Sequence, residues 1–181
     1  MENIFLREVD TENFKHIYDD MLSQFPLSEL KPYEVFIKLL KEKKLQCFSA
    51  FDNDIEIGYI MYAPVGDAVW LEYIAIKKEY HCKGYGRRIL ALLNNCYLEV
   101  EKPDESDVDT IRRIKFYTSL DAKKLDVDYV YPNNYGGLPM DLYYLGATPP
   151  EKESVLGVIR YIFNTLHADI KDVNLIMQNI L

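Results

Sequence analysis

The chain has 181 residues, with 21 Lys and Arg against 29 Asp and Glu, which gives a formal net charge of -8 at pH 7. At ~150 residues per domain, this length predicts one domain with at most a small appendage. An apolar fraction of 49% argues against disorder, and the net acidity argues against nucleic-acid binding through bulk positive charge. We expect no membrane span and no secretory signal, because the sequence has neither a long apolar run nor a basic start that leads into one.

The three cysteines, Cys47, Cys82 and Cys96, favour a reducing compartment. Their number is odd, and no two of them stand at the spacing of metal ligands. The three histidines are also far apart in the sequence. We therefore expect unpaired thiols in a cytoplasmic protein and no zinc or other metal site.

The first half of the chain predicts a strand, two helices and three further strands. Apolar spacing and turn residues place these elements at 4–9, 14–22, 35–40, 46–51, 55–63 and 68–76. The segment 68–76 is almost wholly apolar, which predicts a central strand that is buried on both faces.

The second half predicts a helix around Ile89, a strand at 97–100, a helix at 111–120 and strands at 125–131 and 140–145. Helical spacing resumes at Glu151, with a break near Ala168-Asp169. This order of elements predicts an α/β (α+β) fold, in which a mixed sheet carries helices on both faces.

A glycine-containing loop, His81-Cys82-Lys83-Gly84-Tyr85-Gly86-Arg87-Arg88, follows the central strand and opens a helix. Glycines let successive backbone N–H groups converge, and the start of a helix favours a phosphate or pyrophosphate. The loop lacks the Gly-Lys-Ser/Thr ending of a Walker A motif, and Ile89 stands where the dinucleotide fingerprint has its third glycine. Residues 77–88 hold five basic side chains and one acidic one, so a small polyanion suits this part of an acidic chain.

With its surroundings, the loop resembles the signature of the GNAT superfamily, the acetyl-CoA-dependent N-acetyltransferases. The family's Arg/Gln-x-x-Gly-x-Gly/Ala reads here as His81-x-x-Gly84-x-Gly86, and the family's Phe-Tyr pair on a later helix reads as Phe116-Tyr117. The order of elements matches over residues 1–147. The chain departs from the family at His81, at Thr110 (often Asn) and at Asp121-Ala122 (often Gly-Phe).

The resemblance implies a GNAT-like, mostly antiparallel twisted sheet of about seven strands that opens between Ile76 and the strand at 97–100. It implies one GNAT domain at 1–147, with 148–181 as a C-terminal helical extension packed on the same domain. Acetyl-CoA would be the cosubstrate. Its pantetheine arm and pyrophosphate would bind Ile74, Ala75, Ile76, His81, Cys82, Lys83, Gly84, Tyr85, Gly86 and Arg87.

Acetyl transfer to an amine needs a proton acceptor, because a lysine-like amine is almost fully protonated at pH 7. Glu72 is the only acid on the central strand, and we expect it to be the water-mediated general base. The alternative is a carboxylate at a solvated strand end, paired with a lysine. Tyr117 matches the family's general acid, which would hydrogen-bond the departing thiolate. Its alternative role is that of a core aromatic.

The resemblance places the acceptor amine against two loops, one at 25–27 and one at 131–138. The aromatic residues there and on the neighbouring strand are Phe25, Tyr131, Tyr135 and Tyr143. Such rings bind a cation or an apolar body, or they simply suit β-strands. The acidic chain favours a cationic acceptor, either a small-molecule or a peptide amine.

Two other functions stay open at this stage. A non-catalytic acyl-CoA-binding or regulatory module would keep the loop and would not need Glu72 or Tyr117. A nucleotide-binding phosphotransferase would need Walker and magnesium-ligand motifs, which the chain lacks. The helices after residue 150 would cover the sheet, complete the acceptor pocket or form a homodimer contact.

Overall fold

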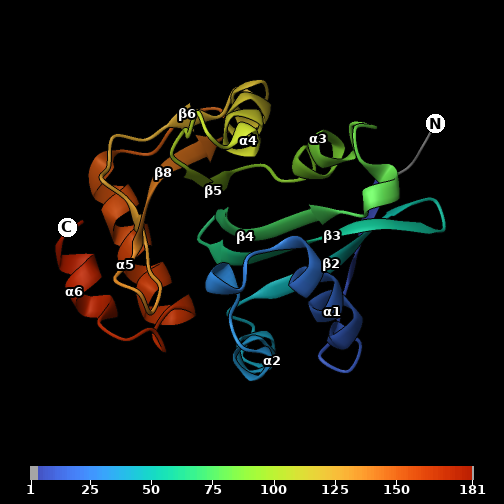
Figure 1. Cartoon of the computed structure of the whole chain (residues 1–181), viewed down its shortest axis with the longest axis horizontal. Coiled ribbons are helices and arrows are strands. Elements are labelled where there is room, and N and C mark those ends of the chain that lie inside the picture. Colours follow the sequence, from blue (N-terminus) through green and yellow to red (C-terminus); the bar gives the residue numbers. More distant parts are fainter. Residues whose placement is uncertain (1–3, 181) are drawn as a thin grey trace. The chain divides into compact units, whose positions relative to one another are not determined.

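A computed structural model describes residues 4–180 of the chain (Figure 1). The strands are β1 (Ile4–Glu8), β2 (Gln46–Asp52), β3 (Ile55–Val65), β4 (Ala68–Ile76), β5 (Cys96–Glu101), β6 (Lys123–Lys124), β7 (Val130–Tyr131) and β8 (Leu138–Leu145). The α-helices are α1 (Phe14–Gln24), α2 (Tyr33–Lys41), α3 (Tyr85–Leu90), α4 (Val108–Thr118), α5 (Lys152–Leu166) and α6 (Val173–Gln178). Two short 3-10 helices, η1 (Leu27–Glu29) and η2 (Lys78–Tyr80), lie between them.

The chain forms two units, and strand β4 contributes to both. Unit 1 comprises the chain up to Pro64 together with Leu71–Leu93, and unit 2 comprises Val65–Trp70 together with the chain from Asn94 onwards. The strand order is β1-β2-β3-β4 in unit 1 and β4-β5-β8-β6 in unit 2, where β7 also pairs with β8. The neighbours β1/β2, β2/β3, β5/β8, β6/β8 and β7/β8 run antiparallel. The predicted mixed α/β fold with an open, mostly antiparallel sheet is confirmed.

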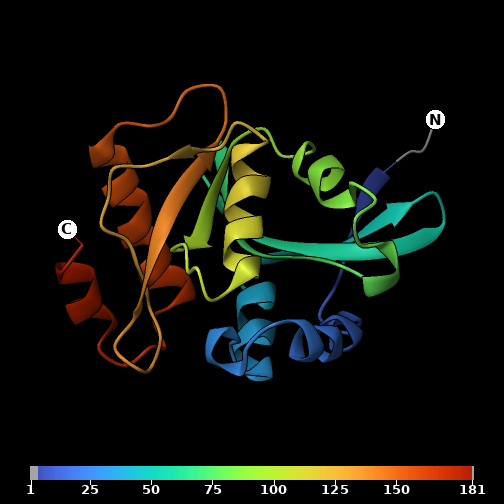
Figure 2. The ribbon, with the colours of Figure 1, turned by 45° about the horizontal axis from the view of Figure 1, so that its top comes forward.

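In unit 1, helices α1 and α2 lie on one side of the strands and α3 lies on the other, as both views show (Figures 1 and 2). The apolar residues of α1 recur at helical spacing, so that one face of this helix is buried. The same holds for α2. The fully buried side chains that these helices and β3 contribute include Phe14, Ile17, Met21, Phe36, Ile57, Tyr59, Ile60 and Met61.

Strands β3 and β4 approach each other closely at Gly58. The pairing of β3 with β2 shifts here, since Ala50 faces Gly58 and Phe51 faces Glu56, and this leaves an extra residue in β3. A Cβ atom on Gly58 would stand 2.1 Å from the carbonyl oxygen of Ala75. The backbone of β4 therefore occupies the space that any side chain at position 58 would need.

Unit 2 is built around an aromatic core. Trp70 stacks on Tyr97 at a centroid distance of 5.7 Å and contacts Tyr129 at 5.8 Å. Helices α4 and α5 lie on opposite sides of β5 and β8 (Figure 2), and Phe163 of α5 contacts Tyr129. The buried residues of α5 are Val155, Ile159, Ile162, Phe163 and Leu166. The predicted division of the chain at residue 147 stays a prediction.

Three predicted features can be compared in detail with the structure. The strand expected at 125–131 is wrong over most of its length, because Val127 donates to the Leu125 carbonyl and Tyr129 to the Val127 carbonyl, so this backbone turns on itself. Strand β4 is not buried on both faces along its length, because Ala68, Trp70, Leu71, Tyr73 and Ala75 are buried whereas Val69, Ile74 and Ile76 are partly exposed. The partial exposure of Glu72 comes mainly from its backbone, since its side chain is only 1% exposed. The predicted helix break near residue 168 is confirmed, since α5 ends at Leu166 and α6 begins at Val173.

Within residues 4–180, every helix is too short or too polar to cross a membrane. Cys47, Cys82 and Cys96 form no disulfide bond in this part of the chain, and of the three only Cys82 is exposed.

Candidate functional site

The glycine loop of unit 1 has the backbone geometry that an anion-binding turn requires. Cys82 and Gly84 both adopt positive φ, at 60° and 79°. A side chain on Gly84 would meet nothing within 4 Å, so conformation and not space explains the glycine. Gly84 precedes α3, whose first turn closes when Arg88 N–H donates to the Gly84 carbonyl. N–H groups at the start of a helix point outward along its axis, toward the space that this exposed loop borders.

Two side-chain hydrogen bonds fix the loop to the strands of unit 1. His81 Nε2 donates to the Ile76 carbonyl at 2.7 Å, which ties the loop to the end of β4. The Tyr85 hydroxyl donates to Asp52 Oδ2 at 2.8 Å, which ties the start of α3 to β2. His81, which replaces the Arg or Gln of the family signature, thus holds the backbone of the loop.

The basic side chains of this segment are not equivalent. Lys77 Nζ lies 2.6 Å from Glu56 Oε2 and is therefore already paired. Burial raises the pKa of the Glu56 carboxyl, but hydrogen bonds from Lys77, Ser49 and His16 more than offset this and leave the pKa below its usual range. Lys78 and Lys83 are exposed, and Lys83 lies over the ring of Tyr80. Of these three lysines, Lys78 and Lys83 are the ones that an anion would meet.

Glu72 lies in the middle of β4 with its side chain only 1% exposed. Its carboxylate Oε2 stands 3.7 Å from Nζ of Lys31, whose side chain is 3% exposed. The lysine partner that the alternative role requires is present, yet the pair is buried and not at a solvated strand end. Ile74, Ala75 and Ile76 follow on the same strand, close to the His81 anchor.

Tyr117 belongs to unit 2, where it stands in the last turn of α4. It is 8% exposed, and its ring contacts that of Phe116. Burial raises the pKa of the Tyr117 phenol to about 12, with a further contribution from Cys96. The hydroxyl is consequently protonated throughout the neutral range and can donate a hydrogen bond.

The residues predicted for the acceptor fall in both units. In unit 1, Phe25 packs edge-on against Tyr73 of β4 at 5.2 Å. In unit 2, Tyr131 is buried against His167, at 5.5 Å between ring centroids, and Tyr143 is buried in β8. Tyr135 is 84% exposed at the tip of the loop before β8. The acceptor role of these four residues stays a prediction.

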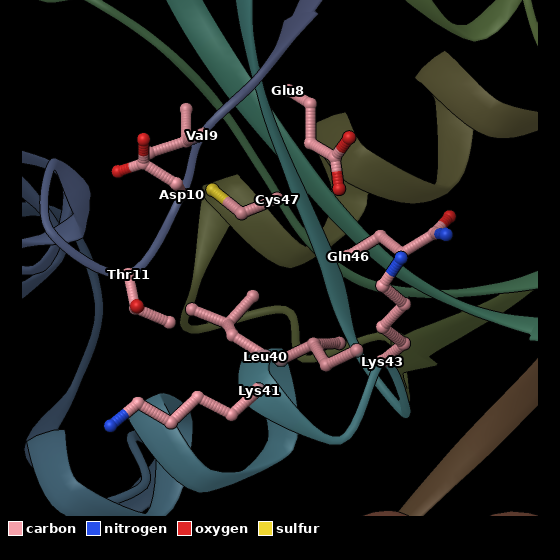
Figure 3. Close-up of a pocket in the computed structure, with 10 residues that line it drawn as sticks. Glu8, Val9, Asp10, Thr11, Leu40, Lys41, Lys43, Gln46 and Cys47 are labelled. Carbon is pink, nitrogen blue, oxygen red and sulfur yellow. The ribbon is translucent and has the colours of Figure 1, made fainter.

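Unit 1 also contains a cavity of about 240 Å³ (Figure 3). It is lined by Glu8, Val9, Asp10, Thr11, Leu40, Lys41, Lys43, Leu45, Gln46 and Cys47. Burial raises the pKa of the Cys47 thiol to about 12, so this sulfur is a poor nucleophile at neutral pH. The cavity contains none of the predicted site residues.

Sequence reasoning did not single out two charged residues, Lys31 and Glu99. Lys31 is buried beside Glu72, although a lysine before a proline in a loop reads as a solvated residue. Glu99 of β5 is another carboxylate on a strand of the sheet, and its Oε1 accepts a hydrogen bond from the Tyr129 hydroxyl. A signal for Glu99 does exist, since it is an acid between Leu98 and Val100 in an apolar segment. Among residues 4–180, no group of three or more His, Cys, Asp or Glu side chains is arranged to hold a metal ion.

Comparison with known proteins agrees with the predicted family. A family model described as "Acetyltransferase (GNAT) domain" matches residues 43–121. YjbC from Bacillus subtilis (strain 168), which carries the name of an acetyltransferase, is 30% identical over 160 residues, which are 83% of this chain and 80% of that protein.

Solved structures show the same fold. A GNAT-family protein from Bacteroides thetaiotaomicron is 25% identical, with a TM-score of 0.77 over 88% of this chain and 96% of its own. The PaiA N-acetyltransferase from Thermoplasma acidophilum, solved in complex with coenzyme A, is 14% identical, with a TM-score of 0.53 over 80% of this chain and 99% of its own.

Proposed function

Because the chain belongs to the GNAT acetyltransferase family, we propose that it transfers the acetyl group of acetyl-CoA directly to a primary amine, with Glu72 as base and Tyr117 as acid. The amine nitrogen attacks the thioester carbon, the carbon–sulfur bond breaks, and an amide and the coenzyme A thiol leave. The amine proton passes to Glu72 through water, and the thiolate takes the proton of the Tyr117 hydroxyl, which water then replaces. The buried carboxylate of Glu72, held in the middle of β4, carries this proposal.

The glycine loop supplies the cofactor part of the proposal. Its exposed backbone, with positive φ at Cys82 and Gly84, suits the pyrophosphate, and Lys83 and Arg87 add positive charge. Residues 74–76 would pair with the pantetheine arm. Coenzyme A is the ligand named for the Thermoplasma acidophilum structure, which shares the fold. The full set proposed for this chain is the one predicted from the sequence, from Ile74 to Ile76 and from His81 to Arg87.

The protonation states of the amine and of Tyr117 at neutral pH are consistent with the roles proposed for Glu72 and Tyr117. An amine with a reference pKa near 10.4 is neutral in only about one of 10³ molecules at pH 7, so a nearby carboxylate gives a large advantage. With a pKa of about 12, Tyr117 holds its proton where the coenzyme A thiolate leaves and stabilises the sulfur by donating a hydrogen bond. Neither role requires a metal ion.

The acceptor is proposed only as a class, a small-molecule or peptide primary amine. Phe25 and Tyr135 have ring surface that is not fully buried, and such rings favour a cation or an apolar body. The net charge of -8 attracts a cationic amine. Thiols without disulfide bonds at Cys47, Cys82 and Cys96 are compatible with the cytoplasmic location that the sequence predicts.

The test is thiol release from acetyl-CoA with a panel of amines. The panel contains spermidine, an amino sugar, a peptide with a free α-amino end, and an N-terminally blocked peptide with one lysine. We expect Glu72→Gln to lower kcat/KM by about 100-fold or more. Glu99→Gln is the matched control, since Glu99 is also a strand carboxylate, and we expect it to retain most activity. The reverse pattern would assign the base to Glu99, and no turnover with any amine would contradict the proposal as a whole.

A further inference from the structure

The buried contact between Lys31 and Glu72 joins two parts of unit 1 that are distant in the sequence. Lys31 lies in the segment between α1 and α2, and Glu72 lies on β4. Their side chains are 3% and 1% exposed, and Nζ stands 3.7 Å from Oε2. This distance exceeds that of a normal N–H···O hydrogen bond, so the contact acts mainly through charge.

The backbone around Lys31 is held by separate contacts with β4 and with α1. The Tyr73 hydroxyl donates to the Glu29 carbonyl at 2.6 Å, and the ring of Phe25 packs edge-on against Tyr73. The Tyr18 hydroxyl donates to the Lys31 carbonyl at 3.4 Å. The backbone that carries Lys31 is therefore fixed, and its ammonium group lies beside Glu72 on a buried side chain.

We propose that Lys31 is a positioning residue for acetyl transfer, which keeps the buried Glu72 carboxylate ionised and oriented for proton acceptance. The inference rests on the proposed role of Glu72 as base. Burial favours the neutral form of a carboxyl group, and a protonated Glu72 has no capacity to take the proton of an ammonium substrate. A cation at 3.7 Å favours the charged form. Glu29 on the loop and Tyr73 on β4 are titratable residues close to this pair in the sequence, and the Tyr73 hydroxyl donates to the backbone carbonyl of Glu29.

A purely structural ion pair is the competing interpretation, because removal of one partner of a buried pair is destabilising in itself. The two interpretations differ in the pH dependence of the reaction. Loss of a positioning cation moves the acidic limb of the kcat/KM profile to higher pH, so activity recovers in base. Loss of a structural contact lowers activity at every pH.

The experiment compares Lys31→Met, Lys31→Gln and Lys31→Arg with the unaltered chain, using acetyl-CoA and whichever amine of the panel gives the largest kcat/KM. For Met and Gln we expect the acidic limb to move up by about 1–3 pH units, so that the loss of kcat/KM is largest on the acidic side of the profile. Arg keeps the charge and should keep the limb within about half a unit of its original position. An unmoved limb in Met and Gln, or an equal movement in Arg, would overturn the inference.

A second measurement requires no substrate. In the background of Glu72→Gln there is no carboxylate to hold, so Lys31→Met should lower the melting temperature by less than it does in the unaltered chain. An equal loss in both backgrounds would show that Lys31 acts independently of Glu72, against the inference. Failure of the proposed function is distinguishable, because there Glu72→Gln itself would leave the turnover intact. If Glu72→Gln abolishes turnover while Lys31→Met leaves the acidic limb of the kcat/KM profile in place, only the role of Lys31 is overturned.

Discussion

Replacement of Gly58 by alanine tests the close approach of β3 and β4. The added Cβ would stand 2.1 Å from the Ala75 carbonyl oxygen and 3.0 Å from the Ile76 Cα. Carbon and oxygen atoms rarely approach closer than about 3.3 Å, so one strand must move by about 1 Å. Both neighbouring atoms belong to the backbone of β4, and a change of side-chain rotamer therefore gives no relief.

The expected destabilisation is at the upper end of what overpacking causes, about 3 kcal/mol. For a chain of this length, 1 kcal/mol shifts the melting temperature by roughly 2–4 °C, which predicts a loss of about 6–12 °C. Thermal unfolding followed by circular dichroism measures it. Because Ala75 and Ile76 belong to the proposed pantetheine segment, acetyl-CoA affinity measured by calorimetry should fall in parallel.

Gly157 supplies the matched control. It is an exposed glycine of α5, and a Cβ atom there would meet nothing within 4 Å. Gly157→Ala should therefore be neutral or stabilise the helix by about 0.5–1 kcal/mol. A melting temperature of Gly58→Ala within about 1 °C of the unaltered chain, with unchanged acetyl-CoA affinity, would refute the reasoning about β3 and β4.

Three further outcomes follow from the site. Tyr117→Phe should lower kcat about 100-fold with nearly unchanged acetyl-CoA affinity, and unaltered thiol release would rule out its acid role. Iodoacetamide should label Cys82 first, because Cys47 and Cys96 are buried, and coenzyme A should slow this labelling if the loop binds it; equal rates, seen by mass spectrometry, would contradict the loop assignment. His81→Ala should raise the dissociation constant of acetyl-CoA about fivefold, through loss of the hydrogen bond that holds the loop, and an unchanged constant in calorimetry would remove that positioning role.

The sequence predicted most of the strands and helices because their apolar periodicity reflects local burial. The segment at 125–131 shows the limit of this reasoning. Its apolar residues are buried at Leu125 and Tyr129, but the backbone between them bonds to itself, and periodicity reports burial and not the partner of each N–H.

The prediction of the site had a similar limit. Glycine spacing identified the loop, whereas the neighbour of Glu72 depended on how the segment between α1 and α2 folds back onto β4. The path of this segment is fixed by long-range contacts, such as the hydrogen bond that the Tyr73 hydroxyl donates to the Glu29 carbonyl. No local sequence pattern encodes such a contact. The role of His81 was equally hidden, because the motif suggests a ligand contact and the structure shows a hydrogen bond to Ile76.

The aromatic core of unit 2 has a consequence for how the protein is made. Trp70 and Tyr129 leave the ribosome before Phe163 and the rest of α5, which later cover this core. At 5–20 residues per second, the delay between Trp70 and Phe163 amounts to roughly 5–20 s. Unit 1, in contrast, has all its strands and helices once Leu93 has been synthesised. We expect nascent chains stalled between Leu93 and α5 to combine a folded unit 1 with an incomplete unit 2. The aromatic core of that unit would remain exposed and bind chaperones.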